Sequence, residues 1–256
     1  IKPTILITSP SIETSKNVSG IANLTRLLLK NNSSVIYKHF IVGKKDSQKR
    51  NASWLFSQFL LPINFIKTLF FNKNIKISHI NIPMSTLAIY VNFILVVISS
   101  IFRKKIIVHF RGGSLSLNEN VSFSQKFIIG KCIKKANKII VLGEKEYHFM
   151  KRFYDINNND KIYILPNAVE VPEFVFDKKS KLNKSDLLNI IFIGRIDKDK
   201  GLEEILLSLK DIRGKINFHF LVAGTGPDQD DFLEKCKNFL GDSFTYVGVL
   251  NNLQKI

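Results

Sequence analysis

The sequence predicts an α/β protein made of two Rossmann-like units in series, each with a parallel sheet. Short apolar runs rich in β-branched residues alternate along the chain with segments that have the spacing of amphipathic helices. A polar, proline-bearing stretch at 171–186 breaks this alternation, which restarts after it. We therefore expect an N-terminal domain at 1–170, a linker at 171–186 and a partial C-terminal domain at 187–256.

The first domain is expected to contain six strands and five helices. The strands are expected at 4–8, 35–42, 75–82, 105–110, 137–143 and 161–167. The helices are expected after Gly20, at 52–71 with an interruption at Pro62, at 84–102, at 121–135 and at 144–153. Because strands that alternate with helices imply βαβ units, we expect a parallel sheet with helices on both faces.

The second domain repeats this pattern on a smaller scale. Its strands are expected at 188–193, 216–223 and 243–249, and its helices at 201–212 and 227–239. A parallel sheet of three strands is small for independent stability. We therefore expect the second domain to be incomplete and the chain to be a fragment of a longer protein.

The segment 84–102 has no charged residue, and its length is close to that of a membrane span. It lies between two strands expected in one sheet, and a spanning helix would place those strands on opposite sides of a bilayer. A helix buried against the sheet is therefore the favoured interpretation. Partial insertion into a membrane face is the alternative, with Arg103, Lys104 and Lys105 reaching the headgroups.

Charge is distributed unevenly along the chain, whose formal net charge is +17. Residues 1–165 hold 25 Lys and Arg against 7 Asp and Glu, whereas residues 166–256 hold 13 against 14. No acidic residue occurs between Asp46 and Glu119. A basic domain favours an anionic partner. We expect an anionic membrane surface and no nucleic acid, because no nucleic-acid-binding module is recognisable.

Cysteine usage and the first residues favour a reducing compartment. The two cysteines lie 104 positions apart, which argues against a zinc site and against a disulfide framework. Residues 1–10 lack the basic start and apolar core of a secretory signal. No Asp-x-Asp pair or His cluster suggests a metal site. We therefore expect no bound metal and a cytoplasmic protein, peripheral at the inner face of the cell membrane.

The stretch 190–210, IIFIGRIDKDKGLEEILLSLK, carries a candidate anion site. Gly194 ends a strand, Gly201 begins a helix, and Arg195 and Lys200 lie in the gap between them. Ligands of open α/β sheets bind beyond the carboxyl ends of the strands, where helix starts offer N–H groups to anions. An arginine and a lysine at this place would hold a diphosphate. Solvated loop charges are the alternative interpretation.

Five stretches occur in the order typical of one enzyme family. They are ANKIIVLGEKE at 136–146, ILPNAVE at 164–170, FIGRIDKDKGLEE at 192–204, FLVAGTGP at 220–227 and TYVGVL at 245–250. Together they resemble family 4 glycosyltransferases, which have the GT-B fold, use nucleotide sugars and retain the sugar's configuration. The resemblance covers nearly the whole chain, weakly before residue 80. It implies transfer from a UDP- or GDP-sugar, without a cofactor, to a saccharide acceptor, expected to be a lipid-linked or envelope or capsular polysaccharide intermediate.

The resemblance also implies roles for single residues. Arg195 and Lys200 would clamp the donor diphosphate and stabilise the charge that grows on it as the sugar departs. His109, in VHFRGG, matches a strand-end histidine that faces the donor sugar, and it is the catalytic candidate. A histidine satisfied by the backbone is the alternative. Gly20 matches a glycine loop near the donor phosphates, although residues 16–20 lack the family's paired glycines.

Other residues are placed beside the nucleotide or the acceptor. Those expected to border the nucleotide are Gly194, Gly224, Gly226 and Asn167, with plain turns as the alternative. Arg111 is a candidate for binding an acceptor phosphate. The family's paired-glutamate motif would follow Ile256, so we expect the chain as given to be inactive or weakly active.

Two other functions are compatible with the sequence. A nucleotide-sugar epimerase of the GT-B type would keep the fold, but it requires acid/base carboxylates, which are absent between Asp46 and Glu119. A truncated, non-catalytic protein that binds membranes through its basic domain is the second alternative. Nucleotide binding by Arg195 and Lys200 separates this alternative from the two enzymes.

Overall fold

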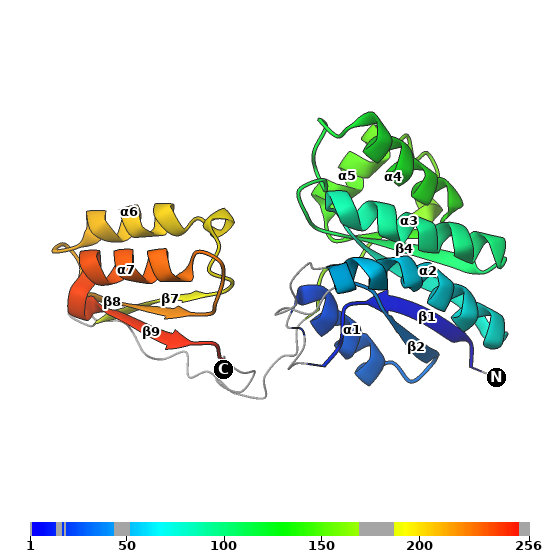
Figure 1. The fold of residues 1–256 in the computed structure, drawn as a ribbon. Helices are drawn as coiled ribbons and strands as arrows, with labels where there is room; N and C mark the ends of the chain where they lie inside the picture. Colours follow the sequence, from blue (N-terminus) through cyan, green and yellow to red (C-terminus); the bar gives the residue numbers. More distant parts are fainter. Residues whose placement is uncertain (1, 14–16, 18, 44–51, 169–186, 251–256) are drawn as a thin grey trace. The chain divides into compact units, whose positions relative to one another are not determined.

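Figure 1 shows the fold in a computed structural model of the chain, which describes residues 2–13, 17, 19–43, 52–168 and 187–250. The chain divides into two compact units, Ile1–Glu170 and Val171–Ile256. The predicted linker at 171–186 lies outside the described residues. Each unit has its own sheet and its own hydrophobic core.

The first unit contains a six-stranded sheet whose strands are all parallel. Its strands are β1 (Thr4–Ser9), β2 (Ile36–Ile41), β3 (Ile75–Pro83), β4 (Lys105–Arg111), β5 (Lys138–Val141) and β6 (Ile162–Ile164), in the order β2-β1-β3-β4-β5-β6. All six predicted strands are present. The last is shorter than predicted, since Pro166 has no N–H with which to extend the ladder.

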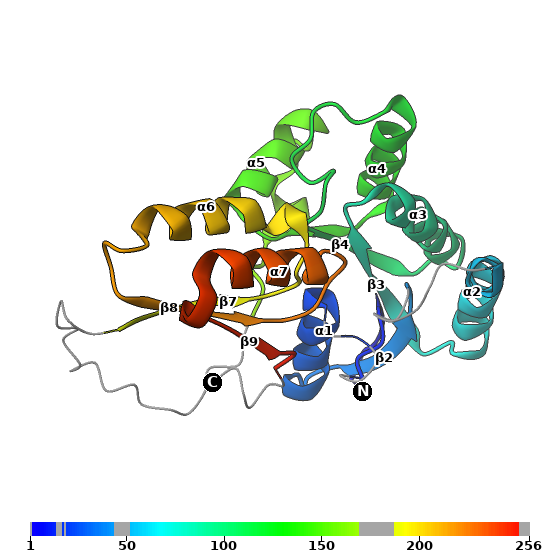
Figure 2. The same cartoon turned by 60° about the vertical axis from the view of Figure 1, so that its left-hand side comes forward.

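Helices cover both faces of this sheet, as predicted. They are α1 (Gly20–Asn31), α2 (Ala52–Phe71), α3 (Thr86–Ile101), α4 (Phe123–Lys135) and α5 (Glu144–Phe153), followed by the short 3-10 helix η1 (Asn159–Lys161). The chain crosses the sheet in one direction from β1 to β2 and in the opposite direction from β2 to β3. Crossover connections between parallel strands are right-handed whichever way the chain moves. As a result, α1 lies on one face, and α2, α3 and α4 lie on the other (Figures 1 and 2).

The predicted interruption of α2 at Pro62 is wrong, because the helix continues through this residue. A proline inside a helix removes one backbone donor and costs about 3 kcal/mol. Burial offsets this cost, since Leu61, Phe65 and Leu69 recur at four-residue spacing and all lie in the core. The ring of Phe65 meets that of Phe40 edge-on, with the ring centroids 5.0 Å apart.

The apolar segment 84–102 forms α3, which packs between sheet and neighbouring helices as the favoured interpretation predicted. Its inner face is buried, and its side chains include Ile89, Leu95 and Val96. Its outer face is exposed at Ile94 and Ile101, so the prediction of full burial is wrong for that face. Among the described residues, none of the helices combines the length and the apolar character that crossing a bilayer requires.

The second unit contains a three-stranded parallel sheet in the order β7-β8-β9. Its elements are β7 (Leu188–Ile193), the 3-10 helix η2 (Lys198–Lys200), α6 (Leu202–Ile212), β8 (Phe218–Ala223), α7 (Gln229–Leu240), the 3-10 helix η3 (Gly241–Ser243) and β9 (Phe244–Gly248). Both α-helices cover the same face of the sheet (Figure 1). The other face leaves Ile191 and Ile193 exposed.

We predict that Phe65→Ala destabilises the first unit by about 3–5 kcal/mol, because it removes a fully buried ring and leaves a cavity. Phe59→Ala on the same helix removes an exposed ring and should change stability by about 0.5 kcal/mol or less. Urea denaturation followed by circular dichroism measures both values. Equal effects of the two substitutions would contradict the orientation of α2.

Candidate functional site

In the first unit, polar side chains gather at the carboxyl ends of two central strands. His79 and Asn81 lie on β3, His109 and Arg111 lie on β4, and all four are buried. Side chains alternate between the two faces of a sheet. The intervening residues, such as Ile80, enter the core beneath α2–α4, so the four polar residues face the opposite side of the sheet.

Arg111 is a buried cation in this group, only 3% exposed. Its Nε donates to Oδ1 of Asn81 at 2.8 Å, and its Nη1 donates to Oδ1 of Asn167 at 3.3 Å. Nη2 is buried without a hydrogen-bond partner among the described residues, and none of their carboxylates forms an ion pair with the guanidinium. Burial lowers the pKa of Arg111 to about 10, so the group stays charged at neutral pH. A buried charge without a counter-charge is costly, so this position favours an anionic ligand.

His109 lies next to this cation and is completely buried. Its Nδ1 lies 3.3 Å from Nε2 of His79, and the two rings are stacked. Burial, followed by the charge of Arg111, lowers the pKa of His109 to about 2 and that of His79 to about 3. Both rings are therefore neutral at physiological pH. Nε2 of His109 has no partner among the described residues, so within them the backbone does not satisfy this nitrogen.

Two members of this group, His79 and Asn81, were missed by sequence reasoning. The strand register pairs Asn81 with His109. His79 therefore lies diagonally across from His109, and Asn81 lies diagonally across from Arg111. A signal was present in the sequence. Near its carboxyl end, each strand carries two polar residues at alternate positions, H-x-N in one and H-x-R in the other.

Close backbone packing fixes the loop that leaves Arg111. The N–H of Met84 donates to the carbonyl of Arg111 at 3.0 Å, and the N–H of Leu115 donates to the carbonyl of Met84 at 2.9 Å. Gly113 lies between these bonds at φ +153°, and a Cβ there would fall 2.4 Å from the oxygen of Met84. Only glycine fits this approach, which holds the ends of β3 and β4 together.

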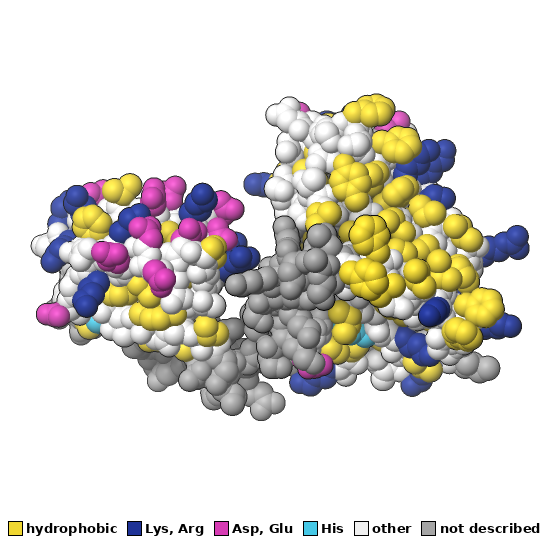
Figure 3. Space-filling view, in the orientation of Figure 1, with side chains coloured by type: hydrophobic (Ala, Val, Ile, Leu, Met, Phe, Trp, Pro, Cys, Tyr) yellow, Lys and Arg dark blue, Asp and Glu magenta, His cyan; other side chains and the backbone are white. Residues whose placement is uncertain are grey.

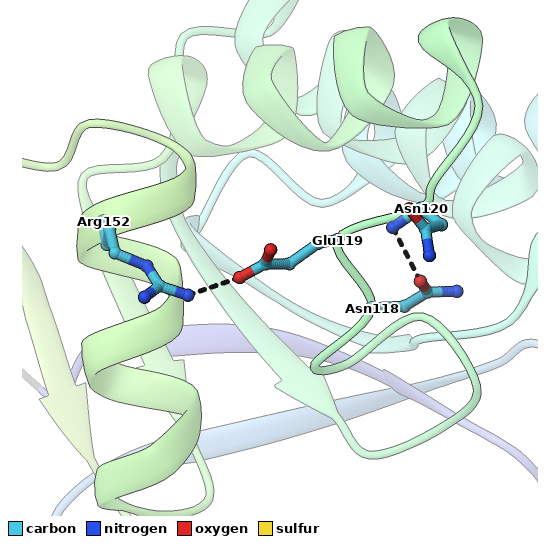
Figure 4. Close-up of polar contacts among 4 residues, drawn as sticks. All are labelled: Asn118, Glu119, Asn120 and Arg152. Atoms are coloured by element: carbon cyan, nitrogen blue, oxygen red, sulfur yellow. Dashed lines mark hydrogen bonds and ion pairs between the residues drawn. The ribbon is translucent and has the colours of Figure 1, made fainter.

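The same loop is braced farther along by polar contacts, which Figure 4 shows. Glu119 forms an ion pair with Arg152 of α5, and the N–H of Asn120 donates to Oδ1 of Asn118 at 2.8 Å. Both charged side chains are largely exposed, so the pair contributes about 1 kcal/mol at most. Glu119 therefore orients the loop without reaching the buried cation.

A mostly apolar pocket of about 200 Å³ opens at the same end of the sheet. Asn81, which holds Arg111, is part of its wall, as are Pro83 and Leu87 at the start of the β3–α3 connection. Oδ1 of Asn92 in the pocket wall is buried without a partner among the described residues. The pocket combines apolar walls with a few polar groups, as small-molecule sites do.

In the second unit, the predicted anion-site residues follow the carboxyl end of β7. Arg195 lies in the loop after the strand, Lys200 ends η2, and both are exposed. Nε of Arg195 lies 3.5 Å from Oδ2 of Asp197. Gly201 at φ +71° separates η2 from α6, so Lys200 belongs to a 3-10 turn rather than to an open gap.

Carboxylates take the N–H groups at the start of η2. Oδ2 of Asp228 accepts from the N–H of Lys198 at 2.8 Å, and Oδ1 of Asp197 accepts from the N–H of Asp199 at 3.2 Å. Acidic residues also occupy the first turn of α6. Anion binding at this place therefore depends on cationic side chains more than on the helix starts that the sequence suggested.

The packing of two loops requires Gly224 and Gly226. A Cβ on Gly224, at φ +136°, would lie 1.7 Å from the oxygen of Gly194, and a Cβ on Gly226 would lie 1.9 Å from the oxygen of Ile196. The N–H of Ile196 also donates to the carbonyl of Thr225 at 3.1 Å. These two glycines are thus explained by the fold itself, whereas Gly194 has no such close neighbour. Their place beside a nucleotide stays a prediction.

The structure groups the predicted residues within each unit. His109, Arg111 and Asn167 come together in the first unit, while Gly20 opens α1 after its N-cap Ser19. A Cβ at Gly20 would meet nothing within 4 Å, so the packing around it does not require a glycine. Within the described residues, no group of three His, Cys, Asp or Glu side chains is placed to hold a metal ion.

The sequence is similar to that of a protein named as a glycosyltransferase, and no protein-family model matches it. Over 161 residues, the chain is 28% identical to an uncharacterized glycosyltransferase of Methanocaldococcus jannaschii. The match covers 57% of this chain and 40% of that protein. The chain thus spans less than half the length of this relative.

Solved structures with the GT-B fold resemble the chain over nearly its whole length. The lipopolysaccharide outer core galactosyltransferase WaaB has a TM-score of 0.58 at 11% identity, covering 99% of this chain and 70% of WaaB. A putative UDP-N-acetylglucosamine 2-epimerase from Listeria monocytogenes has the same TM-score and coverages at 8% identity. The predicted GT-B-like α/β fold is confirmed. Because a transferase and an epimerase match equally well, the fold alone does not separate the two reactions.

We predict that Gly224→Ala destabilises the second unit by about 2 kcal/mol or more, because the new Cβ meets the Gly194 carbonyl and φ is positive. Gly194→Ala is the matched control, since its Cβ would meet only the ring of Phe192 at 3.5 Å. Hydrogen exchange of β8 amides measures the local stability. Loop packing would be refuted by equal protection in the two variants.

We also predict that the first unit loses stability as pH falls from about 6.5 toward about 3. The folded-state pKa values of His79 and His109 are lowered, so the unfolded chain binds protons that the folded chain does not. The free energy of unfolding then falls by up to about 1.4 kcal/mol per pH unit for each histidine. Urea denaturation at several pH values should show a smaller slope for His79→Gln/His109→Gln than for the parent. A double variant with the parental slope would disprove the assignment.

Proposed function

We propose that the chain forms part of a retaining glycosyltransferase that moves a sugar from a UDP- or GDP-sugar to an acceptor. The observation that carries this proposal is the buried Arg111, which has no ion-pair partner among the described residues, beside neutral His109 at the carboxyl ends of a GT-B-like sheet. Similarity to a named glycosyltransferase supports it. A solved structure with a similar fold, that of MnaA from S. aureus, was determined with UDP. It has a TM-score of 0.53 at 11% identity, and the match covers 98% of this chain and 70% of MnaA.

The proposed roles of the two units follow from their charged residues. Arg195 and Lys200 would hold the donor diphosphate, where their fixed charges stabilise the leaving group without a metal ion. His109 would meet the donor sugar through its unpartnered Nε2. Arg111 would hold an acceptor phosphate, since its guanidinium has a free donor and no described counter-charge. Asn167, which accepts a hydrogen bond from Arg111, would help to position its guanidinium.

The acid/base properties of the site favour transfer over epimerisation. Moving a proton on a sugar carbon requires a base whose pKa lies near the working pH. The two histidines at the described carboxyl edge have pKa values of about 3 and about 2, which makes them poor bases. None of the site residues described in the first unit is a carboxylate. A site that only binds and polarises its ligands suits glycosyl transfer.

The acceptor and the location follow from the charge of the first unit. We propose a lipid-linked or envelope polysaccharide acceptor whose phosphate reaches Arg111. Attraction of an anionic bilayer contributes about 1 kcal/mol per Lys or Arg near the surface. The protein would therefore work in the cytoplasm, peripherally at the inner face of the cell membrane.

We predict that Arg195→Ala and Lys200→Ala each weaken binding of UDP or GDP by about tenfold to a hundredfold, as expected for charged hydrogen bonds of about 1.5–3 kcal/mol. Both side chains are exposed, so the fold should remain intact. Isothermal titration calorimetry on the 256-residue chain measures the affinity. Lys210→Ala, at the far end of α6, is the control and should bind normally.

Two outcomes would contradict the proposal. Equal affinity of the double variant and the parent would leave Arg195 and Lys200 as solvated loop charges. A changed sugar on the donor, formed without any acceptor, would instead identify an epimerase.

A further inference from the structure

The first unit exposes a broad apolar surface on the side of the sheet that carries α2, α3 and α4 (Figure 3). We call it the α2–α4 face and define it by Phe59, Phe70, Phe71, Ile94, Ile101 and Phe123, all of which are exposed. Phe123 reaches 87% exposure, and Phe59 and Phe71 each reach 77%. Single exposed apolar residues are ordinary, but contiguous patches of this kind mark interaction sites.

Helix α2 carries two apolar stripes, although it packs against the core with only one. The inner stripe, through Leu61, Phe65 and Leu69, is buried. The outer stripe recurs every three or four residues at Phe56, Phe59, Ile63, Ile66 and Phe70, and every member is exposed. An exposed apolar stripe on a helix that already packs against the core with another stripe offers a contact surface. The outer stripe has no partner among the described residues.

The patch continues across the neighbouring helices without interruption. α3 lies against both α2 and α4. At one end of the α3–α4 pair, the hydroxyls of Tyr90 and Ser124 are 2.9 Å apart. At the other end, Nζ of Lys135 donates to Oγ of Ser100 at 3.4 Å. Because the helices are locked side by side, their outward residues form one surface.

The charged side chains on the three helices of this surface all have the same sign. No Asp or Glu occurs in α2, α3 or α4, whereas Lys67, Lys126, Lys134 and Lys135 are exposed on α2 and α4. Arg103 follows the end of α3 directly and is exposed as well. Figure 3 shows Lys and Arg side chains at the rim of the apolar patch. Cations around exposed aromatic and aliphatic groups are typical of surfaces that bind at a bilayer interface.

We propose that the α2–α4 face docks the first unit on an anionic lipid surface. The phenylalanine rings enter the acyl boundary, and the surrounding Lys and Arg side chains meet the headgroups. A second copy of the chain fits this face poorly, because dimerisation would bring two cationic rims together. The inference deepens the membrane-associated function proposed above. In this proposal the protein binds the lipid surface through the α2–α4 face, whose apolar groups insert, and not through its net charge alone.

The test uses sedimentation of the 256-residue chain with phosphatidylcholine vesicles, with and without phosphatidylglycerol. Screening by about 1 M NaCl, where the Debye length is about 3 Å, should remove the electrostatic contribution and leave measurable residual binding. The variant Phe59→Ser/Phe71→Ser/Phe123→Ser should bind anionic vesicles about a hundredfold more weakly and lose the residual binding at high salt. All three rings are exposed, so the variant should fold.

A control comes from the second unit, where Ile191, Leu207 and Val249 are exposed apolar residues that lie outside the α2–α4 face. Ile191→Ser/Leu207→Ser/Val249→Ser should bind vesicles as the parent does. Parental vesicle binding by the phenylalanine variant, or loss of all binding at high salt, would overturn the proposal. So would a dimer in light scattering that the phenylalanine variant abolishes. UDP affinity of the same variant reports on the proposed enzyme separately and should be unchanged.

Discussion

The common direction of the strands is the constraint on which the first unit depends. Six parallel strands place all their carboxyl ends at one edge, and every crossover from β2 to β5 then lies on one face. One edge thus collects the polar ends of β3 and β4, while one face collects three apolar helices. The candidate site and the proposed docking surface are two results of the same topology.

Strand pleating divides the central residues between these two roles. On β4, Val108 and Phe110 support the helices, while His109 and Arg111 form the site. A one-residue shift in the register of β4 would put the cation in the hydrophobic core. The fully buried core and the close approach of Gly113 to Met84 both fix that register. The second unit uses the same device, since Gly224 and Gly226 hold its two loops together.

Sequence periodicity was sufficient to predict every β-strand and α-helix that the structure describes, although not the 3-10 helices, because apolar spacing records which face of an element is buried. It failed at Pro62, where tertiary burial of Phe65 outweighs the local cost of proline. The family resemblance pointed to Arg111 and His109 but not to their partners His79 and Asn81, since contact across strands depends on register. Periodicity favoured a buried α3 and did not predict its exposed outer side, because hydropathy does not distinguish a core from an exposed apolar surface.

The stacked histidines have a consequence that follows from counting their hydrogens. Two neutral imidazoles carry two ring protons, and the bond between Nδ1 of His109 and Nε2 of His79 uses one of them. If His109 donates, its Nε2 is a bare lone pair; if His79 donates, the same atom is an N–H. The tautomer of one ring therefore dictates that of the other. The pair can present an acceptor or a donor to a sugar hydroxyl without either ring gaining charge.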